Sequence, residues 1–512
     1  MNIRKRLWTC LLVSGIPFSA CLPAAAAVFT VTESFWGDAT TTNSFAWALN
    51  QANTTPGDDI INLQLTSGNT IDVDAATPVS SSFLGRITDS VEIQGNGVTL
   101  VGTPRFVATN GTIYTKTLIP AANPSIAAGD VVVQPAFSFA EILPTAITVA
   151  IDKLNLDGLN GYLSGGIFMS VHNSLIKNSV SYGFGARPVF EALASALELK
   201  NVILDSINPL ANNQLGSAWF GAIQGVNATL QMTNSVIKGA STSVGAILWK
   251  GSADVVSSII TGDAGGLSIE GPGSVLNFVN SLFSPSEISS TARIQAKDGG
   301  VANLTASTIQ ANQLFINTEL DCATSPSWYG CNGSPLQAYD GGQINLSQSI
   351  VSTINADLNG ILNPYSETYL AFPAGNLTAD LLSYVQPTPS LDPTALQALF
   401  NQPGLLTGTI PYALTNGGLL YGDLPEGAYL VPGSPLRRAI ADADGANQLR
   451  SPIDNSVIRT DVFGNPRTAF GTRDIGAVQS PAEVPGPLPA LGLAAAFRWF
   501  RRLRRTVRAG RR

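Results

Sequence analysis

The sequence predicts an all-β fold, a right-handed parallel β-helix in which successive coils of the chain stack into a rod. Three observations predict it. A β-rich phrase recurs from about residue 90 to 355, one position of the phrase is apolar in every copy, and the turn before it is rich in asparagine. Only 12% of the 512 residues are charged and 49 are glycine, which suits short strands joined by tight turns.

The recurring phrase reads IDKLNLDG from Ile151, VHNSLIKN from Val171 and MTNSVIKG from Met232. Aligned on its turn residue, it recurs at intervals of 20, 28, 33, 23, 23, 26 and 42 residues. Such intervals fit one coil of a parallel β-helix with loops of varying length. The turn residues are Lys153, Asn173, Asn201, Asn234, Ser257, Asn280, Ala306 and Gln348.

The position three residues after the turn predicts the interior. Stacked coils lie about 4.8 Å apart, so one sequence position repeats as a column of similar environments. At the turn itself, asparagine tolerates left-handed backbone and its amides can bond to one another along the stack. The predicted interior column is Leu156, Ile176, Leu204, Ile237, Ile260, Phe283, Ile309 and Val351.

Two further columns flank the interior one. Asp157, Lys177, Asp205 and Lys238 alternate in sign on successive coils, which predicts a register-setting surface ladder worth about 0.2–1 kcal/mol per pair. The other column should face outward and yet is apolar, so we expect a loop, the C-terminal segment or another molecule to cover it. It consists of Leu175, Ile203, Val236, Ile259, Leu282 and Ile350.

The N-terminal part predicts a cap for the rod. A strand at Phe29 and Val31 precedes TTNSFAWALNQAN, an amphipathic helix with Asn43 or Ser44 as N-cap, and a Pro-Gly turn leads back to a strand. This order resembles the entry cap of secreted bacterial parallel β-helix proteins, in which a helix plugs the open end of the core. We assign residues 28–90 to this cap and 91–385 to the solenoid, with VEIQGNGVTLVG from Val91 as its first full coil.

After about Ser352 the repeat fades, and Asp392 and Pro393 predict the start of a short helix reaching about Phe400. Residues 386–482 form an irregular C-terminal module that resembles choice-of-anchor Q, found on exported β-helix proteins just before anchoring signals. The alternative is a closing coil in which Arg467 and Asp474 pair to hold a loop. The positions that carry the resemblance are Gly433, Ser434, Pro435, Asp461, Gly464, Pro466, Arg467, Asp474, Ile475 and Gly476.

The N-terminus reads as a secretory signal peptide over residues 1–27. Arg4, Lys5 and Arg6 precede an apolar stretch, and Ala25 to Ala27 offer an A-x-A cleavage site, which places the mature start near Val28. In the alternative interpretation Cys21 is a lipoprotein acceptor. Either reading takes the chain out of the cytoplasm.

The last residues, 484–512, predict a sorting signal. A proline-rich start leads into a short apolar run from Leu488 to Phe497, and eight arginines follow, an order that stops a chain in a membrane with its basic end in the cytoplasm. It resembles the PEP-CTERM signal, which exosortase-type enzymes recognise and remove. The resemblance implies a short C-terminal membrane helix, transient anchoring, and an exosortase-like protease and a secretion translocon as partners; a membrane-surface anchor is the alternative. The signal residues are Val484, Pro485, Gly486, Pro487, Arg501, Arg502, Arg504 and Arg505.

Without both signals the chain holds 17 cations against 35 acids, a net charge near −18. This balance argues against nucleic-acid binding, which needs basic patches. Cys322 and Cys331 flank the turn-rich segment ATSPSWYG and predict a disulfide in an oxidising compartment. Two thiols without a nearby histidine are too few for a metal site, and the sequence predicts no cofactor.

The sequence gives little support for an enzymatic activity. His172 is the only histidine and is expected in a surface turn. Asp157 and Asp205, two coils or about 9.6 Å apart with Lys177 between them, are weak catalytic candidates for glycoside hydrolysis. Lys177 would keep both carboxylates ionised, whereas a glycosidase needs one proton donor. The DADG run at Asp442 and Asp444 lacks the later ligands of a calcium loop.

These observations favour an exported, exosortase-processed, non-enzymatic protein. Its expected place is the cell envelope, cell surface or extracellular polysaccharide matrix, with polysaccharide as a candidate partner. A polysaccharide hydrolase or lyase on the same scaffold is the alternative. An adhesin that binds through the apolar outer column is the third hypothesis.

Overall fold

The computed structural model describes the stacked coils, the N-terminal cap and part of the C-terminal module. The described residues are 26–73, 85–102, 105–108, 113–115, 131–133, 137–139, 147–159, 167–178, 190–205, 221–238, 245–262, 266–285, 294–311, 336–338, 341–353, 376–385, 393–407, 436–441, 443, 445, 447–467 and 471–479.

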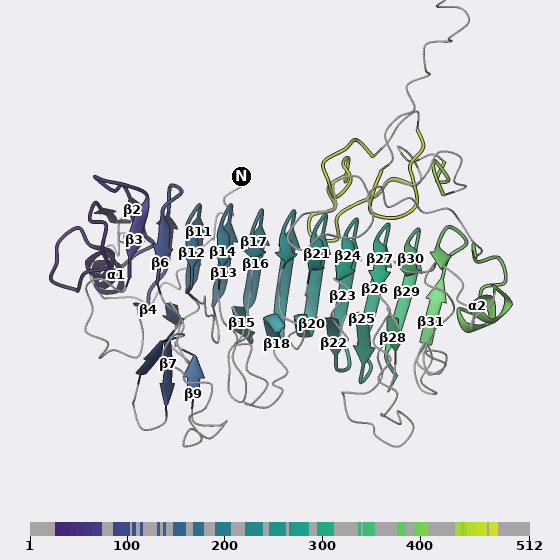
Figure 1. Cartoon of the computed structure of the whole chain (residues 1–512), viewed down its shortest axis with the longest axis horizontal. Helices are drawn as coiled ribbons and strands as arrows, with labels where there is room; N and C mark the ends of the chain where they lie inside the picture. Colours follow the sequence, from purple (N-terminus) through teal and green to yellow (C-terminus); the bar gives the residue numbers. More distant parts are fainter. Residues whose placement is uncertain are drawn as a thin grey trace, which may run out of the picture.

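The chain is mostly β and is built of long parallel sheets that run the length of a rod (Figure 1). Successive coils each add a strand to the first sheet, which has sixteen strands, and to the second, which has eleven. Along its main path the first sheet contains β1 (Val28–Val31), β2 (Asp59–Leu63), β5 (Val91–Gln94), β11 (Thr148–Asp152), β13 (Phe168–His172), β16 (Ala196–Lys200), β18 (Gly221–Thr233), β20 (Gly245–Val256), β23 (Val275–Val279), β26 (Val301–Thr305), β29 (Gln343–Ser347) and β31 (Asn376–Ala379).

The second sheet consists of shorter strands that follow the first sheet after one turn. It contains β3 (Thr70–Asp72), β6 (Thr99–Val101), β12 (Asn155–Asp157), β14 (Leu175–Lys177), β17 (Ile203–Asp205), β19 (Val236–Lys238), β21 (Ile259–Gly262), β24 (Leu282–Pro285), β27 (Thr308–Ala311), β30 (Ile350–Thr353) and β32 (Tyr384–Val385).

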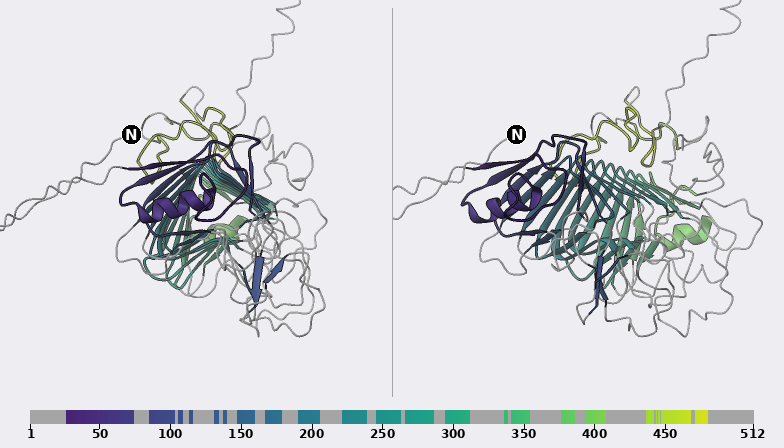
Figure 2. Two further views of the ribbon diagram at one scale, coloured as in Figure 1. Left: turned by 90° about the vertical axis from the view of Figure 1, so that its left-hand side faces the viewer. Right: turned by 60° about the vertical axis from the view of Figure 1, so that its left-hand side comes forward.

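A third face is formed where two long strands bend. The N-terminal halves of β18 and β20 pair with β15 (Phe190–Leu193) and β22 (Leu267–Glu270), and the ladder continues through β25 (Ile294–Lys297) and β28 (Leu336–Ala338). At the bend Gly251 has φ +132°, and a Cβ there would lie 2.2 Å from the Ala228 carbonyl oxygen, so only glycine fits. Seen along the rod, the faces enclose the core (Figure 2).

Two small sheets lie beside the first coils. β10 (Phe137–Phe139) pairs with β4 (Gly85–Ile87), and β7 (Arg105–Ala108) pairs antiparallel with β8 (Ile113–Thr115) and β9 (Val131–Val133). Strands β7 to β10 belong to the long interval between the coils of β5 and β11, whereas β4 precedes β5.

The predicted interior column is confirmed. Leu156 pairs with Ile176, and the register continues residue by residue to Ile309 and Val351. All eight side chains are buried, at most 6% exposed. Burial of an aliphatic side chain contributes about 1.5–3 kcal/mol, so this one column is a major source of stability.

The predicted turn column is confirmed as well. All eight turn residues have left-handed backbone, with φ between +47° and +54°. The register of the coils therefore places one unusual conformation at the same point of each coil, and asparagine is common there because it adopts this conformation at low cost.

Both ends of the stack are covered. Helix α1 (Phe45–Thr54) begins after Ser44, whose hydroxyl accepts a hydrogen bond from the Trp47 amide at 3.2 Å, so Ser44 rather than Asn43 is the N-cap. It lies across the N-terminal end of the rod (Figure 2). Helix α2 (Pro393–Leu399) lies at the opposite end, where Leu396 and Phe400 join the core.

The solenoid is longer at both ends than the sequence repeat indicates. β2 and β3 form a coil before Val91, and β31 and β32 continue both sheets beyond Ser352. β31 and β32 lie within the solenoid bounds predicted from the sequence, 91–385, whereas β2 and β3 lie in the part that was assigned to the cap.

Candidate functional site

The most elaborate assembly of polar and apolar contacts is the docking of a C-terminal stretch on the side of the rod. Residues 436–479, here called the flank segment, lie against the turn column and the second sheet rather than adding another coil (Figure 1). The expectation of a closing coil is therefore wrong. The segment lacks long strands and meets the solenoid mainly through side chains.

The flank segment covers the second half of the apolar outer column, and the C-terminal segment was one of the predicted covers. Ala477 packs on Ile259 and Leu282, and Ile475 packs in a cluster with Ile350. These three column residues are at most 4% exposed, whereas Ile203, at an earlier coil, is 39% exposed. Because an apolar column in water is unfavourable, burial of its second half gives the flank segment a driving force to dock.

A third apolar cluster lies across the turn. Leu449, with Ile453 and Ile458 beside it, packs on Val256, Val279 and Ala306. The flank segment thus straddles the edge between the first and second sheets.

Arg467 ties the flank segment to the turn column. Its Nε donates to Asn280 Oδ1 at 2.6 Å, and its Nη2 donates to the carbonyl oxygens of Ala306 at 3.3 Å and Gly476 at 2.6 Å. The side chain is fully buried. Burial and the charge of Arg473 lower the pKa of Arg467 to about 9, against the opposing effect of Asp461 and Asp474, so the guanidinium stays charged at neutral pH.

Arg473 repeats this arrangement at the next turn. Its Nη2 donates to Gln348 Oε1 and to the Asn447 carbonyl oxygen, and its backbone pairs with that of Ile440. Burial lowers the pKa of Arg473 to about 10, while Asp380 acts to raise it. Two buried arginines therefore contact successive turn residues, Asn280, Ala306 and Gln348, across three coils.

Two carboxylates shape the flank segment itself. Asp461 accepts hydrogen bonds from the amides of Phe463, Asn465 and Gln479, and Asp474 accepts one from the Arg438 amide at 2.8 Å. Both are buried, and their effect on the pKa of Arg467 places them in its electrostatic field. They act mainly as acceptors for the backbone of an otherwise irregular loop.

Gly476 is required where the flank segment approaches the second sheet. It has φ +90°, and a Cβ would lie 2.6 Å from Thr308 Oγ1 and 2.8 Å from Ile350 Cδ1. The neighbouring Ala477 amide donates to Thr308 Oγ1 at 2.9 Å. Arg467 and Gly476, two of the positions on which the predicted resemblance to an anchoring module rests, thus make docking contacts.

The weak catalytic candidates are part of the charge ladder. Lys177 pairs with Asp157 at 3.0 Å, and Lys238 pairs with Asp205 at 3.0 Å, all on the outer face of the second sheet. The four side chains are 24–40% exposed. Each carboxylate is held by a lysine ammonium, an arrangement that suits a structural ladder.

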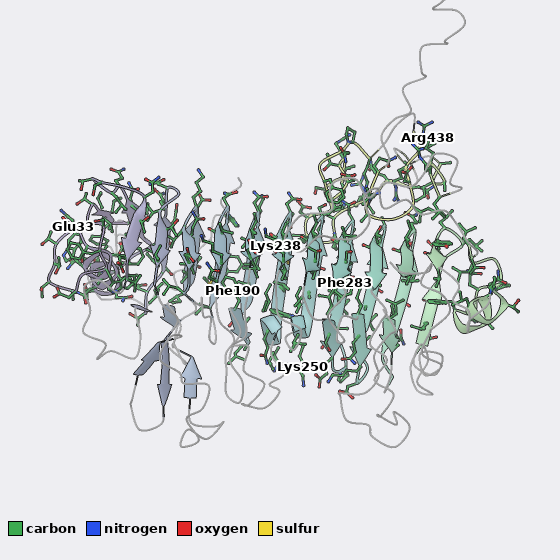
Figure 3. The ribbon with its side chains drawn as sticks, in the orientation of Figure 1. Glu33, Phe190, Lys238, Lys250, Phe283 and Arg438 are labelled. Atoms are coloured by element: carbon green, nitrogen blue, oxygen red, sulfur yellow. The ribbon has the colours of Figure 1, made fainter. Side chains whose placement is uncertain are left out.

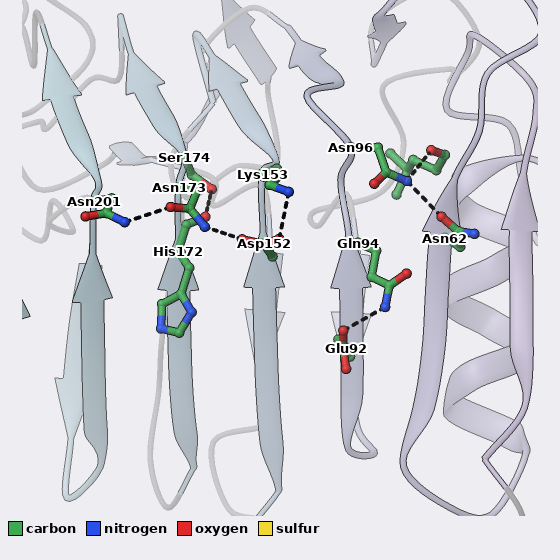
Figure 4. Close-up of polar contacts among 11 residues, drawn as sticks. Asn62, Glu92, Gln94, Asn96, Asp152, Lys153, His172, Asn173, Ser174 and Asn201 are labelled. Carbon is green, nitrogen blue, oxygen red and sulfur yellow. Dashed lines mark hydrogen bonds and ion pairs between the residues drawn. The ribbon is translucent and has the colours of Figure 1, made fainter. Parts of the chain in front are cut away.

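His172 ends strand β13, immediately before the turn, and its Nε2 lies 3.0 Å from Glu198 Oε1. Beside it the turn amides bond along the stack (Figure 4): Asn201 donates to Asn173 at 2.8 Å and Asn173 donates to Asp152 at 2.6 Å. These contacts join side chains of successive coils, as expected of a surface ladder.

Sequence reasoning missed a serine column directly after the turn. Ser235, Ser258, Ser281, Ser307, Ser349 and Ser383 are buried at 0–1%. Each hydroxyl accepts from the amide one coil earlier, as Ser281 does from Ser258 at 3.1 Å. The signal was present in the recurring pairs Asn-Ser and Ser-Ser, in which only the first residue was weighed.

Two more polar features were missed on the outside of the rod. Asp254, Asn277, Asn303 and Asn345 bond in series across the first sheet at 2.8–3.0 Å. On the third face Glu270 pairs with Lys250 and Lys297, and Lys250 lies on the side of the rod opposite Arg438 of the flank segment (Figure 3).

Several predicted features lie outside the described residues: the leader with Cys21, the Cys322–Cys331 pair, Asp392, Asp442, Asp444, Gly433 to Pro435 and the tail 484–512. Within the described ranges, no helix has the length and hydrophobicity that crossing a bilayer requires. In the same part of the chain, no three His, Cys, Asp or Glu side chains gather into a potential metal site.

No protein-family model, curated protein or solved structure matches this chain.

Proposed function

We propose that this chain is an exported, non-enzymatic protein of the cell envelope or extracellular polysaccharide matrix, cut at its tail by an exosortase-like protease. The two terminal sequence signals support export and sorting. The stack supports a right-handed parallel β-helix, because parallel crossover connections are right-handed in about 98% of cases.

The observation that carries the non-enzymatic part is the pairing of Asp157 with Lys177 and of Asp205 with Lys238. A hydrolase on this scaffold would need one carboxyl group free to donate a proton to its substrate, whereas each of these two carboxylates is held in an ion pair on the surface ladder. The outer faces carry bonded ladders, which suit a stiff rod that presents a repetitive polar surface. Polysaccharide is the partner class that such a surface and a net charge near −18 fit, through neutral hydroxyls rather than acidic groups.

The position of the flank segment supports sorting at the tail. Gln479, the last described residue, is buried and its amide donates to Asp461 at 2.9 Å. The tail therefore begins at a fixed point on the side of the folded rod, only a few residues before Val484. A protease in the membrane would meet the tail next to a folded domain.

Intact mass of the protein from envelope and medium tests the proposal. We expect a species that has lost both the leader and the residues after about Val484, and glutamine at Arg501, Arg502, Arg504 and Arg505 should abolish the second cut. A matched control replaces Arg450, Arg459, Arg437 and Arg438 of the flank segment. An unprocessed tail in the wild-type protein would contradict the proposal.

The enzyme alternative is tested separately. The purified mature protein is incubated with acidic and neutral polysaccharides, and released sugars are measured. Release that is lost in the Asp157→Asn, Asp205→Asn double variant would replace the structural role by a catalytic one.

A further inference from the structure

We infer that the leader is cut between Ala26 and Ala27, and that the freed α-ammonium of Ala27 forms a buried ion pair with Asp59. The inference rests on the proposed export and adds the cut site and its consequence for folding. It concerns the first strand of the rod, far from the flank segment.

Asp59 is a buried carboxylate in which one of the two oxygens has no hydrogen-bond partner among the described residues. It begins strand β2 and is 0% exposed. Its Oδ1 accepts a hydrogen bond from the Ala27 amide at 2.9 Å, whereas its Oδ2 is buried and has no partner among the described residues. Buried ionised groups are normally paired with an opposite charge, so one unsatisfied oxygen at this position calls for a cation.

In the precursor the Ala27 nitrogen is not a cation, but in the processed chain it is. In the precursor Ala27 nitrogen belongs to an amide with one hydrogen, which Oδ1 already uses. Hydrolysis of the Ala26–Ala27 bond adds a hydroxyl group to the Ala26 carbonyl carbon and leaves an amine that takes a proton from water. The resulting ammonium carries three hydrogens and a positive charge, enough to serve both oxygens of the same carboxylate.

The backbone fixes the cut to this bond. The Ala27 carbonyl oxygen accepts from the Ile60 amide at 2.8 Å, so Ala27 extends the pairing of β1 with β2, while Ala26 is exposed. A cut after Ala27 would remove the Ala27 amide, the partner that Oδ1 has among the described residues, and the acceptor of the Ile60 amide. Ala24 to Ala26 satisfies the A-x-A rule as well as Ala25 to Ala27 does, so the leader itself permits either cut.

The pair would make folding of the first strand depend on processing. With the leader attached, the buried charge of Asp59 lacks its counter-ion and the pairing of β1 with β2 is weakened. After the cut, the N-terminus is held in place, which closes the edge of the sixteen-stranded sheet beside α1. A strand edge held in this way is also less available for aggregation.

The first test is the N-terminal sequence and intact mass of the exported protein. We expect Ala27 as the first residue. A start at Val28, Ala26 or a lipidated Cys21 overturns the inference while export stands. A retained leader overturns both the inference and the proposed export.

The second test does not depend on export. The chain from Ala27 to Arg512 is prepared with a free and with an acetylated N-terminus, since acetylation keeps one N–H but removes the charge. We expect acetylation to lower the Tm by several degrees below pH 8, where a free α-amino group is charged even when unfolded. Because the pair raises the pKa of the ammonium in the fold, the difference should vanish as the pH rises through that higher value.

The Asp59→Asn variant closes the cycle. In it, acetylation should change the Tm by less than one degree. If this variant does not fold, the pH dependence of the free and acetylated wild-type chains decides alone. If the free and the acetylated chains have the same Tm at pH 6, as they should at pH 10, the ion pair is overturned.

Discussion

Arg467 contacts Ala306, the one member of the eight-residue turn column whose side chain is a methyl group. The Arg467 Nη2 donates to the Ala306 carbonyl oxygen at 3.3 Å, although the two residues are 161 positions apart. Ala306 has φ +47° and lies between Asn280 and Gln348 in the turn column. We expect the methyl side chain of Ala306 to leave room for the guanidinium, which also contacts the neighbouring turn residue Asn280.

Ala306→Asn should release the flank segment. Asparagine suits the left-handed backbone better than alanine does, so loss of docking would come from the side chain that fills the space of Arg467. Ala306→Gly is the matched control. It relieves strain of about 1 kcal/mol and loses a buried methyl worth about 0.8 kcal/mol, and docking should persist. Limited proteolysis within residues 436–479 measures the difference, and equal protection of both variants would contradict this account.

Arg467→Met should destabilise the docked segment by about 3 kcal/mol. It leaves Asn280 Oδ1 and two carbonyl oxygens without their donor in a buried site. Arg459→Met, an exposed arginine of the same segment, should change stability by no more than about 0.5 kcal/mol. Chemical denaturation with a fluorescence probe on the flank segment gives both values.

Ile259→Lys should undock the flank segment, whereas Ile203→Lys should not. Both residues occupy the apolar outer column, but Ile259 is 4% exposed beneath Ala477 and Ile203 is 39% exposed. A buried lysine without a partner is costly. Hydrogen exchange of the Ala477 amide should become fast only in the first variant. Fast exchange in both variants would mean that a lysine in this column undocks the flank segment by disturbing the stacked coils.

Ser281→Ala should cost about 1–3 kcal/mol. The Ser281 hydroxyl accepts from the Ser258 amide and donates to the Val279 carbonyl oxygen at 2.8 Å, so its removal leaves a buried amide unsatisfied. Ser252→Ala, at an exposed position of β20, is the control and should be nearly neutral. Similar thermal midpoints for the two variants would remove the serine column from the list of stabilising features.

Glu270→Gln should lower the free energy of unfolding at neutral pH. It should also make that free energy fall less as the pH is lowered. Burial acts to raise the pKa of Glu270, but hydrogen bonds and charge from Lys250 and Lys297 prevail and lower it below 4.5. A carboxyl group whose pKa is lowered by folding stabilises the fold at pH values above its pKa in the unfolded chain. This contribution disappears as the pH falls through its pKa in the folded chain. Lys250 is half-exposed and Lys297 is buried, and with Glu270 itself partly open to solvent we expect an effect of about 1 kcal/mol.

The control is Glu92→Gln, an exposed glutamate of the first sheet. Unfolding free energies between pH 3 and pH 7 should converge for wild type and Glu270→Gln as the pH falls. A constant difference across that range would mean that the lysines do not act on Glu270 through its charge.

The sequence alone determined the regular part of this protein. Stacking at a fixed spacing repeats one environment at one sequence position, so the apolar column from Leu156 to Val351 and the left-handed turns could be read from the repeat. Ser44 and the helix after it follow from equally local rules of capping.

Only the tertiary structure showed that the flank segment covers the second half of the outer column. It also showed that Arg467 contacts Ala306 in the turn column and that Ala27 lies beside Asp59. Each of these depends on contacts between distant positions, such as Arg467 with Asn280, 187 residues apart. Loops of unequal length set those contacts, and no local pattern encodes them. For the same reason the sequence offered two equivalent leader cuts, while a buried carboxylate 32 residues away distinguishes between them.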